Sequence, residues 1–284
     1  SLTNNTSGGS NTAIGYNALY YNTTADRNTA VGLSAMQNNQ TGTRNVAVGS
    51  FALDALVSAH YNIAIGDNAL GLHTGHGAIG IGDMAAGNNV QNYTVAVGHE
   101  ALKSNTSGQY NTAIGTWALT TNNTAANNTA IGYQALNDQA GASAQNTAIG
   151  SMAMVNNNGG EYNTSLGYYA MKQGTTGNFN VAIGANALDA VNTGSYSNAV
   201  GYLALSENTS GASNQAFGAG AGKAITTGAN NVAIGHDALS TETVGDHSVA
   251  IGYLALQDQV SDSAGQDVLN TAVGSMAGGN LTTG

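Results

Sequence analysis

A nine-residue pattern, N-T-A-[I/V]-G-x-x-A-[L/M], recurs along the whole chain and constrains the fold more than any other feature. It occurs in sixteen copies, and eleven of the fifteen spacings between their glycines are 17 residues, the others being 16, 16, 18 and 22. Helical-pair repeats need about 33 to 47 residues, so this shorter unit favours one coil of a narrow β-solenoid. We call the glycine before x-x-A the anchor glycine; the anchors are Gly15, Gly32, Gly49, Gly66, Gly82, Gly98, Gly115, Gly132, Gly150, Gly167, Gly184, Gly201, Gly218, Gly235, Gly252 and Gly274.

Positions counted from the anchor carry a fixed type of residue. The residue before the anchor is bulky and apolar in every copy, and the third residue after it is always alanine. The fourth residue after it is Leu or Met in thirteen copies, and the fourth before it is Asn in twelve. Stacked coils place each residue above its equivalent in the next coil, about 4.8 Å away, which explains such columns.

The segment before each anchor alternates with period two, as a strand does. Thr or Val and Ile share one face, whereas Asn, Ala and Gly share the other. We predict an all-β fold, a parallel β-solenoid (β-roll) of about sixteen coils with 17-residue repeats, each coil having two short strands and two bends. The Ile/Val and Leu/Met columns are expected inside the coil, and the small-residue face is expected to stay uncovered.

Two further expectations concern the polar positions. The Asn column is expected to form a ladder in which each side-chain amide bonds the amides above and below it. Glycines ten residues after the anchor, such as Gly42 and Gly108, are expected to take positive φ in the bends.

The composition removes several classes of function. Only 7% of the 284 residues are charged, with 5 Lys and Arg against 15 Asp and Glu and a net charge of -10. So few basic residues cannot neutralise the phosphates of a nucleic acid, and no apolar run is long enough to insert into a membrane. The absence of cysteine excludes disulfides and thiolate metal sites. The absence of proline fits a chain whose N–H groups bond between coils.

The copies N-T-A-I-G-Y-N-A-L at 11–19 and N-T-A-I-G-Y-Q-A-L at 128–136 resemble the repeats of bacteriophage and prophage tail-fibre shafts. In that family the array often precedes a C-terminal intramolecular chaperone of the endosialidase type. The A-[I/V]-G-x-x-A core is similar to the head repeats of trimeric autotransporter adhesins, which are shorter and form a left-handed parallel β-roll. The resemblance covers all 284 residues.

A thin coil buries little core for its length, which favours lateral association with closed symmetry. The number of subunits comes from the resemblance, which implies a homotrimer. Residues 1–284 begin and end within a repeat and carry no capping sequence, although solenoids need caps. We therefore expect one continuous solenoid array that is a segment of a longer fibre.

The acidic residues form no obvious catalytic pair. A glycosidase needs two carboxylates at a defined separation, whereas the acids here are spread about one per coil, among them Asp26, Asp54, Asp67, Asp83, Glu100 and Asp138. We therefore predict no catalytic residue and no cofactor. The long insertion between Gly252 and Gly274 carries Asp258, Asp262 and Asp267, for which we expect a plain surface loop. A calcium-binding or receptor-contacting loop is the alternative, because carboxylates suit Ca²⁺.

The other candidate sites are also weak. His73 and His76 lie close to Asp67 in sequence, but we expect an ordinary solvated turn and no metal, because a metal site needs a third ligand at fixed geometry. His60, His99, His236 and His247 form no cluster in sequence. The segment G-A-G-A-G-K at 218–223 lacks the spacing of a phosphate-binding loop and stays in register with the repeat.

Aromatic residues recur five positions before the anchor, in three consecutive coils as Tyr162, Phe179 and Tyr196. We expect these three rings to stack as a ladder, and contact with a glycan is the alternative role. Threonine recurs three positions before the anchor, as in ice-binding solenoids, but Val, Ile, Asn and Gln interrupt that column.

We predict a non-enzymatic structural protein: a stiff, homotrimeric shaft of a phage tail fibre on the virion, supporting attachment to the host receptor. The expected partners are further copies of the chain, other fibre or virion proteins and a host surface glycan. A bacterial surface adhesin or extracellular filament is the main alternative, and a carbohydrate-active enzyme or ice-binding solenoid is less favoured. If the Ile/Val column is internal, Ile131→Asp should disrupt several coils.

Overall fold

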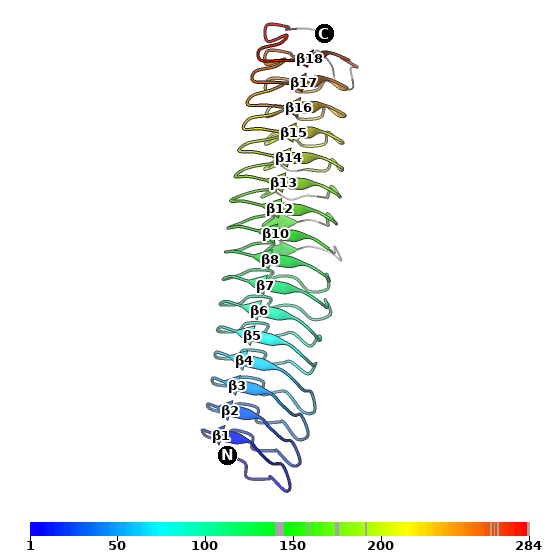
Figure 1. The fold of residues 1–284 in the computed structure, drawn as a ribbon. Helices are drawn as coiled ribbons and strands as arrows, with labels where there is room; N and C mark the ends of the chain where they lie inside the picture. The colour runs from blue at the N-terminus through cyan, green and yellow to red at the C-terminus, as the bar shows by residue number, and fades with distance from the viewer. Residues whose placement is uncertain are drawn as a thin grey trace. The chain divides into compact units, whose positions relative to one another are not determined.

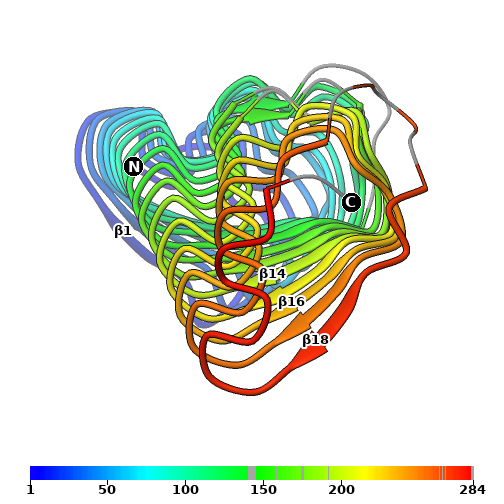
Figure 2. The ribbon, with the colours of Figure 1, turned by 90° about the horizontal axis from the view of Figure 1, so that it is seen from above.

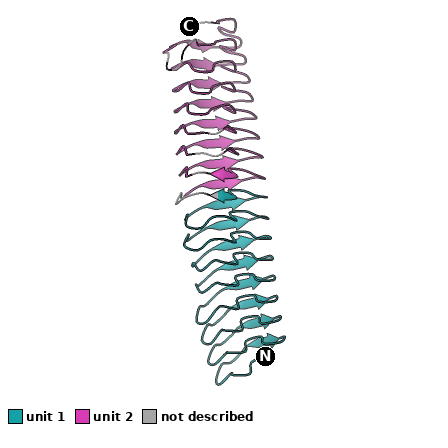
Figure 3. Ribbon diagram, turned by 180° about the vertical axis from the view of Figure 1, so that it is seen from behind, with its two compact units in different colours: residues 1–144 teal, residues 145–284 magenta. Residues whose placement is uncertain are grey.

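The computed structural model describes residues 1–139, 145–157, 159–173, 176–190, 192–261, 263, 265 and 267–282. The chain divides into two compact units, residues 1–144 and 145–284, which Figure 3 colours separately. Among the described residues, no helix has the length and apolarity needed to cross a membrane. Asp262 and Gly284 lie outside the described residues.

Unit 1 is a parallel β-solenoid in which three-residue strands stack in chain order (Figure 1). Each strand pairs in register with the next, so that Thr12 lies beside Thr29 and Ile14 beside Val31. The pattern continues through the last of these pairs, where Ile114 lies beside Ile131. The strands of unit 1 are β1 (Thr12–Ile14), β2 (Thr29–Val31), β3 (Val46–Val48), β4 (Ile63–Ile65), β5 (Ile79–Ile81), β6 (Val95–Val97), β7 (Thr112–Ile114), β8 (Thr129–Ile131) and the two-residue β9 (Asp138–Gln139).

Unit 2 repeats the same arrangement. Seen from above, its coils lie over one another, and the labelled strands β14, β16 and β18 follow the same side of the coil (Figure 2). Even across the 22-residue repeat the register holds, with Val249 beside Thr271. The strands of unit 2 are β10 (Thr147–Ile149), β11 (Asn156–Asn157), β12 (Thr164–Leu166), β13 (Val181–Ile183), β14 (Asn198–Val200), β15 (Gln215–Phe217), β16 (Val232–Ile234), β17 (Val249–Ile251) and β18 (Thr271–Val273).

The predicted fold class, an all-β parallel solenoid with repeats of about 17 residues, is confirmed. The expectation of two strands in every coil is wrong, because most described repeats contain one strand and the rest of the coil is a series of turns. Those turns still bond to the neighbouring coils. The N–H of Leu53 donates to the carbonyl of Ala69 at 3.1 Å, and the N–H of Phe51 donates to that of Leu33 at 2.8 Å. Turn segments thus satisfy their backbone groups as a sheet does.

The interior of the coil is lined by small residues and by one column of Leu and Met. The middle residue of each strand points inward, as do the alanine and the Leu or Met that follow the anchor, for example Ala47, Ala52 and Leu53, all fully buried. The Ile/Val column lies outside: Ile65 is 40% exposed. The predicted alternation is therefore correct, but the two faces were assigned the wrong way round. Small side chains fill the inside because the strand and the returning turn lie close together, so the apolar face is the uncovered one.

The Asn column is largely buried, and the expected amide-to-amide bond occurs from Asn45 Nδ2 to Asn28 Oδ1 at 3.2 Å, but most bonds of the column go to the backbone. The side chain of Asn28 instead spans to the backbone of the next coil: its Oδ1 accepts the N–H of Asn45 at 2.9 Å, and its Nδ2 donates to the carbonyl of Gly42 at 2.7 Å. Asn45 repeats both bonds, to Asn62 and Ala59, each at 2.9 Å. We call this arrangement the asparagine clamp. It fastens successive coils at a bend, where strand pairing is absent.

The anchor glycines are required for two reasons. Their φ angles lie between 128° and 143°, a region that side-chain-bearing residues rarely adopt. In addition, a Cβ on Gly98 would lie 2.6 Å from the carbonyl carbon of Gly115 in the next coil. The bend glycines differ: Gly42 and Gly108 do not take the predicted positive φ. They match Gly160, where a Cβ would lie 2.6 Å from the carbonyl oxygen of Gly177, so they are needed for close stacking alone.

Candidate functional site

The outer face of the strands is the most extended feature of the surface. It consists of two columns, the first and third residues of the strands β1 to β8 in unit 1 and of their equivalents in unit 2, and we call it the strand face. Its third-residue column is Ile, Val, Leu or Phe throughout, and neither column contains a charged residue. Protein interfaces have such a core, depleted of charge, with a polar rim. The interrupted threonine column is the other half of this face.

Polar and aromatic residues border the strand face. Arg44 and Tyr61 each lie five positions before the anchor of their own coil. The guanidinium carbon of Arg44 lies over the ring of Tyr61, 5.4 Å from the ring centroid. Its Nη1 also donates to the Tyr61 hydroxyl at 2.5 Å. On the other border, Tyr16, Tyr168 and Tyr202 follow their anchors and are exposed. The strand face thus has an uncharged centre and a rim that can form hydrogen bonds.

Tyr162, Phe179 and Tyr196 stack as the sequence predicts. Their ring centroids are 4.9 Å and 5.2 Å apart, with interplanar angles of 7° and 5°. Each ring therefore covers the face of its neighbour, and Phe179 has both faces covered. A sugar that stacks on an aromatic face would find only the outer faces of Tyr162 and Tyr196 free of this ladder. Glycan contact at these three residues stays a prediction.

Glu242 is a buried acid that sequence reasoning missed. It lies seven residues after its anchor, where seven of the sixteen coils have Asn, and it is fully buried. Its Oε1 accepts the N–H groups of Gly245 at 2.8 Å and Thr243 at 2.9 Å, and its Oε2 accepts from Gln259 and Ser261, both at 2.9 Å. Burial raises the pKa of this carboxyl, but the hydrogen bonds outweigh it and leave the pKa lowered. Glu242 therefore holds a turn as an ionised carboxylate.

The histidines also differ from expectation. His73 is not in a solvated turn: it is fully buried, with Nδ1 3.0 Å from the carbonyl oxygen of Asn89 and Nε2 3.2 Å from Oδ1 of Asn62. Burial, the largest cause, lowers its pKa to about 4. His76 lies beside His60, with ring centroids 5.3 Å apart, and its Nδ1 accepts the N–H of His60 at 3.1 Å. These contacts fasten neighbouring coils to one another.

One group of ionisable residues was not foreseen. Ligand atoms of Asp246, His247 and Asp267 lie within 4.8 Å of one another, so one divalent cation could contact all three. Asp246 and His247 already have other roles: Asp246 Oδ1 accepts the N–H of Ala229 at 2.7 Å, and His247 Nδ1 pairs with Asp267 Oδ1 at 2.7 Å. The insertion thus brings Asp267 to the repeat below it, which sequence spacing could not show. Asp258 is not part of the group, and Asp262 lies outside the described residues.

The remaining candidates fit the repeat. The segment 218–223 stays in register, with the N–H of Gly222 donating to the carbonyl of Ala238 at 2.9 Å, as the matching residue does in other coils. His99 pairs with Asp83 at 3.1 Å, and its Nε2 lies 4.0 Å from Glu100. The first is a surface contact between neighbouring coils and the second lies within one coil, and such exposed pairs contribute little to stability.

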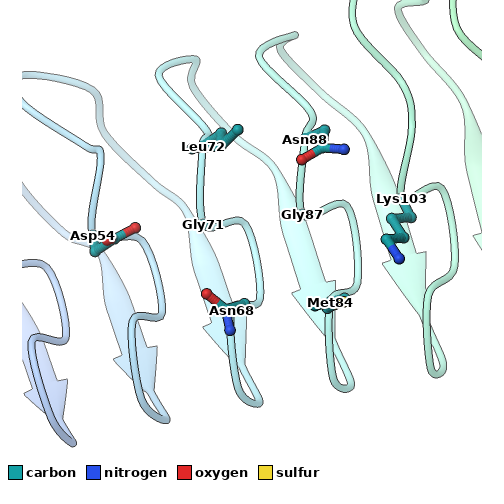
Figure 4. Close-up of a pocket in the computed structure, with 8 residues that line it drawn as sticks. All are labelled: Asp54, Asn68, Gly71, Leu72, Met84, Gly87, Asn88 and Lys103. Carbon is teal, nitrogen blue, oxygen red and sulfur yellow. The ribbon is translucent and has the colours of Figure 1, made fainter.

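Unit 1 contains a cleft of about 220 Å³ along four consecutive coils, which we call the trough. Figure 4 shows the trough with Asp54 at one end and Lys103 at the other; its lining residues are Asp54, Asn68, Gly71, Leu72, Met84, Gly87, Asn88 and Lys103. Burial raises the pKa of the Asp54 carboxyl, although backbone hydrogen bonds oppose this. The trough has a single carboxylate, whereas glycoside hydrolysis by the usual route needs two.

Comparison of the chain with protein-family models, with curated proteins and with solved structures returns no match. Any functional conclusion therefore depends on the geometry of the repeat and of its surfaces.

Proposed function

We propose that this chain is a structural segment of a phage tail fibre, a stiff homotrimeric shaft that supports attachment to a host receptor. The observation that carries the proposal is the strand face. It is continuous within each unit and free of charge, one of its two columns is apolar throughout, and it belongs to a coil whose own interior is already filled by Ala, Leu and Met. Further copies of the same chain are the partners that would cover it along its length.

The stacking supports a mechanical role. The N–H of Gly32 donates to the carbonyl of Ile14 at 2.8 Å in the coil below, and that of Met36 donates to Ala52 at 2.9 Å in the coil above. Each coil is thereby fastened to both neighbours, and the asparagine clamps fasten the bends. A quasi-one-dimensional array of this kind transmits force along its axis and offers few loose segments to proteases.

A fibre role also fits the surface chemistry. Exposed Asn, Thr, Ser and Gly residues hydrate the bends, and only 7% of residues are charged. In this proposal the shaft lies on the outside of the virion, bound to other fibre or virion proteins, with a host surface glycan as its distal target.

The native mass in dilute solution tests the proposal. A trimer has three times the chain mass of 28.3 kDa, about 85 kDa by light scattering. Ile131→Asp puts a charge on the strand face and should lower this mass, while far-ultraviolet circular dichroism stays that of a folded solenoid. Asn123→Asp adds the same charge at an exposed bend and should leave the mass unchanged. A wild-type monomer would overturn the trimer.

A further inference from the structure

The trough exists because two coils lack a side chain that others have. At the fifth residue after the anchor, coils carry side chains such as Asp54, Lys103, Lys172 and Lys223, but the two 16-residue repeats have Gly71 and Gly87. A Cβ on either glycine would lie 3.3 Å from a backbone oxygen of its own coil, that of Asn68 or Met84, a close contact that coils with a side chain at this position accommodate. The trough is therefore two coils wide, and its ends, Asp54 and Lys103, are three coils or roughly 14 Å apart.

The lining of the trough offers hydrogen bonds of both kinds beside an apolar surface. Asn68 and Asn88 contribute two amides, and within the described residues neither amide bonds to another protein group. Leu72, which is 56% exposed, lies next to Asn88. Lys103 keeps hydrogens to donate, although its Nζ lies 2.8 Å from Glu100 Oε1.

The charges argue for a neutral ligand. The cation in the trough is paired with Glu100, and the chain carries a net charge of -10, so a phosphate or polyanion is disfavoured. The Asp54 carboxylate is half-buried and can accept hydrogen bonds at the other end. A ligand that fits must offer an N–H or O–H donor, a carbonyl acceptor and a small apolar group over a length of one or two sugar rings.

We propose that the trough binds an N-acetylated sugar, such as an N-acetylhexosamine unit of a surface glycan. The acetamido group combines the three required features: its methyl suits Leu72 and Met84, its N–H suits Asp54, and its carbonyl suits the amide donor of Asn68 in the neighbouring coil. Asn88 and the Lys103 ammonium lie further along the trough, where they suit hydroxyl groups of the sugar. This site differs from the aromatic ladder of unit 2, which has mostly covered ring faces.

Occupation of the trough does not compete with the strand face. The Leu column lies between them: a Cβ on Gly80, the inward residue of β5, would lie 2.8 Å from Cγ of Leu70. None of the residues that line the trough belongs to a strand, and Gly71, Leu72, Gly87 and Asn88 follow that buried column in their coils. Sugar binding therefore stands independently of trimer formation, although it supplies the glycan contact that the proposed fibre role includes.

The test uses N,N′-diacetylchitobiose as the probe and the whole chain, with binding followed by saturation-transfer NMR and calorimetry. Gly87→Lys fills the trough with the side chain that Lys103, Lys172 and Lys223 place at the same position, so the repeat should still fold; circular dichroism checks this. Gln257→Lys makes the same kind of change at the same repeat position in unit 2 and is the matched control.

The wild-type chain and Gln257→Lys should bind the probe alike, and Gly87→Lys should lose binding. Asp54→Asn should weaken binding about tenfold through the loss of a charged acceptor. Cellobiose, which has no acetamido group, should also bind at least about tenfold more weakly. Absence of binding to the wild-type chain at tens of millimolar, equal binding by Gly87→Lys, or equal binding of cellobiose would overturn the proposal.

Discussion

The regular coils between Gly15 and Gly66 and the two shorter coils between Gly66 and Gly98 share one strand register but are fastened differently. Each regular coil uses the asparagine clamp, from Asn11 through Asn62. The shorter coils have Ala78 and Thr94 in that column. They also carry His73 at the position of the buried Asn22 and Asn39, and Ala86 in place of Leu.

The difference shows that the strands alone keep the register, while the other columns set how firmly each coil is held. The strand β5 pairs with β4 and β6 as regularly as any other, with Ile79 beside Ile63 and Val95. Loss of one residue per coil leaves that pairing intact. The same two shorter coils have Gly71 and Gly87 where other coils carry a side chain, and these glycines leave room for the trough. The proposed sugar-binding surface thus arises where the fastening is least regular.

The largest effect is expected within the shorter coils themselves. Gly82→Ala adds a Cβ 2.6 Å from the carbonyl oxygen of Gly98, at a φ of 128°, so both the contact and the backbone are strained. We expect a loss of about 4 kcal/mol or more in the free energy of unfolding, measured by urea titration. Gly87→Ala, five residues later and facing the open trough, should change it by less than about 1 kcal/mol. Equal effects would contradict the stacking role of the anchor.

The next largest effect is expected from exchanging a core residue between the regular and the shorter coils. Leu53→Ala gives a regular coil the residue that Ala86 provides in a shorter one. Leu53 is fully buried, so its truncation leaves a cavity and should cost about 3 kcal/mol. Ile65→Ala on the strand face should cost less than about 1 kcal/mol in the monomer, because Ile65 is 40% exposed. A larger loss at Ile65 than at Leu53 would reverse the inside and outside of the coil.

The repeat length and the period-two alternation were sufficient to predict the solenoid and its parallel register. They could not tell which face of the strand is inside, because both faces are uncharged and fit a stacked column. The decisive fact is conformational. Leu53 and its equivalents have φ near +50°, as do the residues two positions after each anchor, and left-handed leucines are unexpected from sequence. Glycine replaces Leu at Gly222 and Gly278, where φ is 58° and 62°, which fits this geometry.

The candidate sites were less predictable for a related reason. Stacking of Tyr162 on Phe179 follows from spacing alone, since equivalent positions lie in one column. The trough depends on missing side chains at Gly71 and Gly87, and the meeting of Asp246 with Asp267 depends on the path of a 22-residue repeat. Neither leaves a pattern of chemical groups along the sequence. A search for glycines at positions that elsewhere carry side chains would have indicated the trough.

A pH-dependent effect belongs to the shorter coils. The pKa of His73 is about 4 in the folded chain against 6.5 for an ordinary histidine, so the folded state binds fewer protons between these values. The stabilisation by neutral His73 is fully present above pH 6.5. As the pH falls toward 4, the free energy of unfolding decreases by about 3 kcal/mol at most. Burial is the main cause, and His76 adds to it.

His73→Asn, the residue of the regular coils, should remove this part of the pH dependence. The measurement is the change in unfolding free energy between pH 7 and pH 5 for the variant and the parent chain. His236→Asn is the control, because His236 is exposed and faces Asp237 at the surface. A pH dependence that His73→Asn leaves unaltered would show that His73 takes up its proton without opening the coil.

The smallest effect is expected from exchanging the clamp residue between a regular and a shorter coil. Asn45→Ala gives a regular coil the residue found at Ala78, and it removes the acceptor of the Asn62 N–H and the donor to Ala59. Both groups are buried, so we expect a loss of about 2 kcal/mol. The reverse exchange, Ala78→Asn, provides an acceptor for the N–H of Thr94 and should stabilise unit 1 by at most about 1 kcal/mol. Opposite signs for the two exchanges would show that the clamp fastens coils independently of repeat length. If Ala78→Asn destabilises instead, the 16-residue coil is too short to seat the amide, and the clamp belongs to the 17-residue repeat alone.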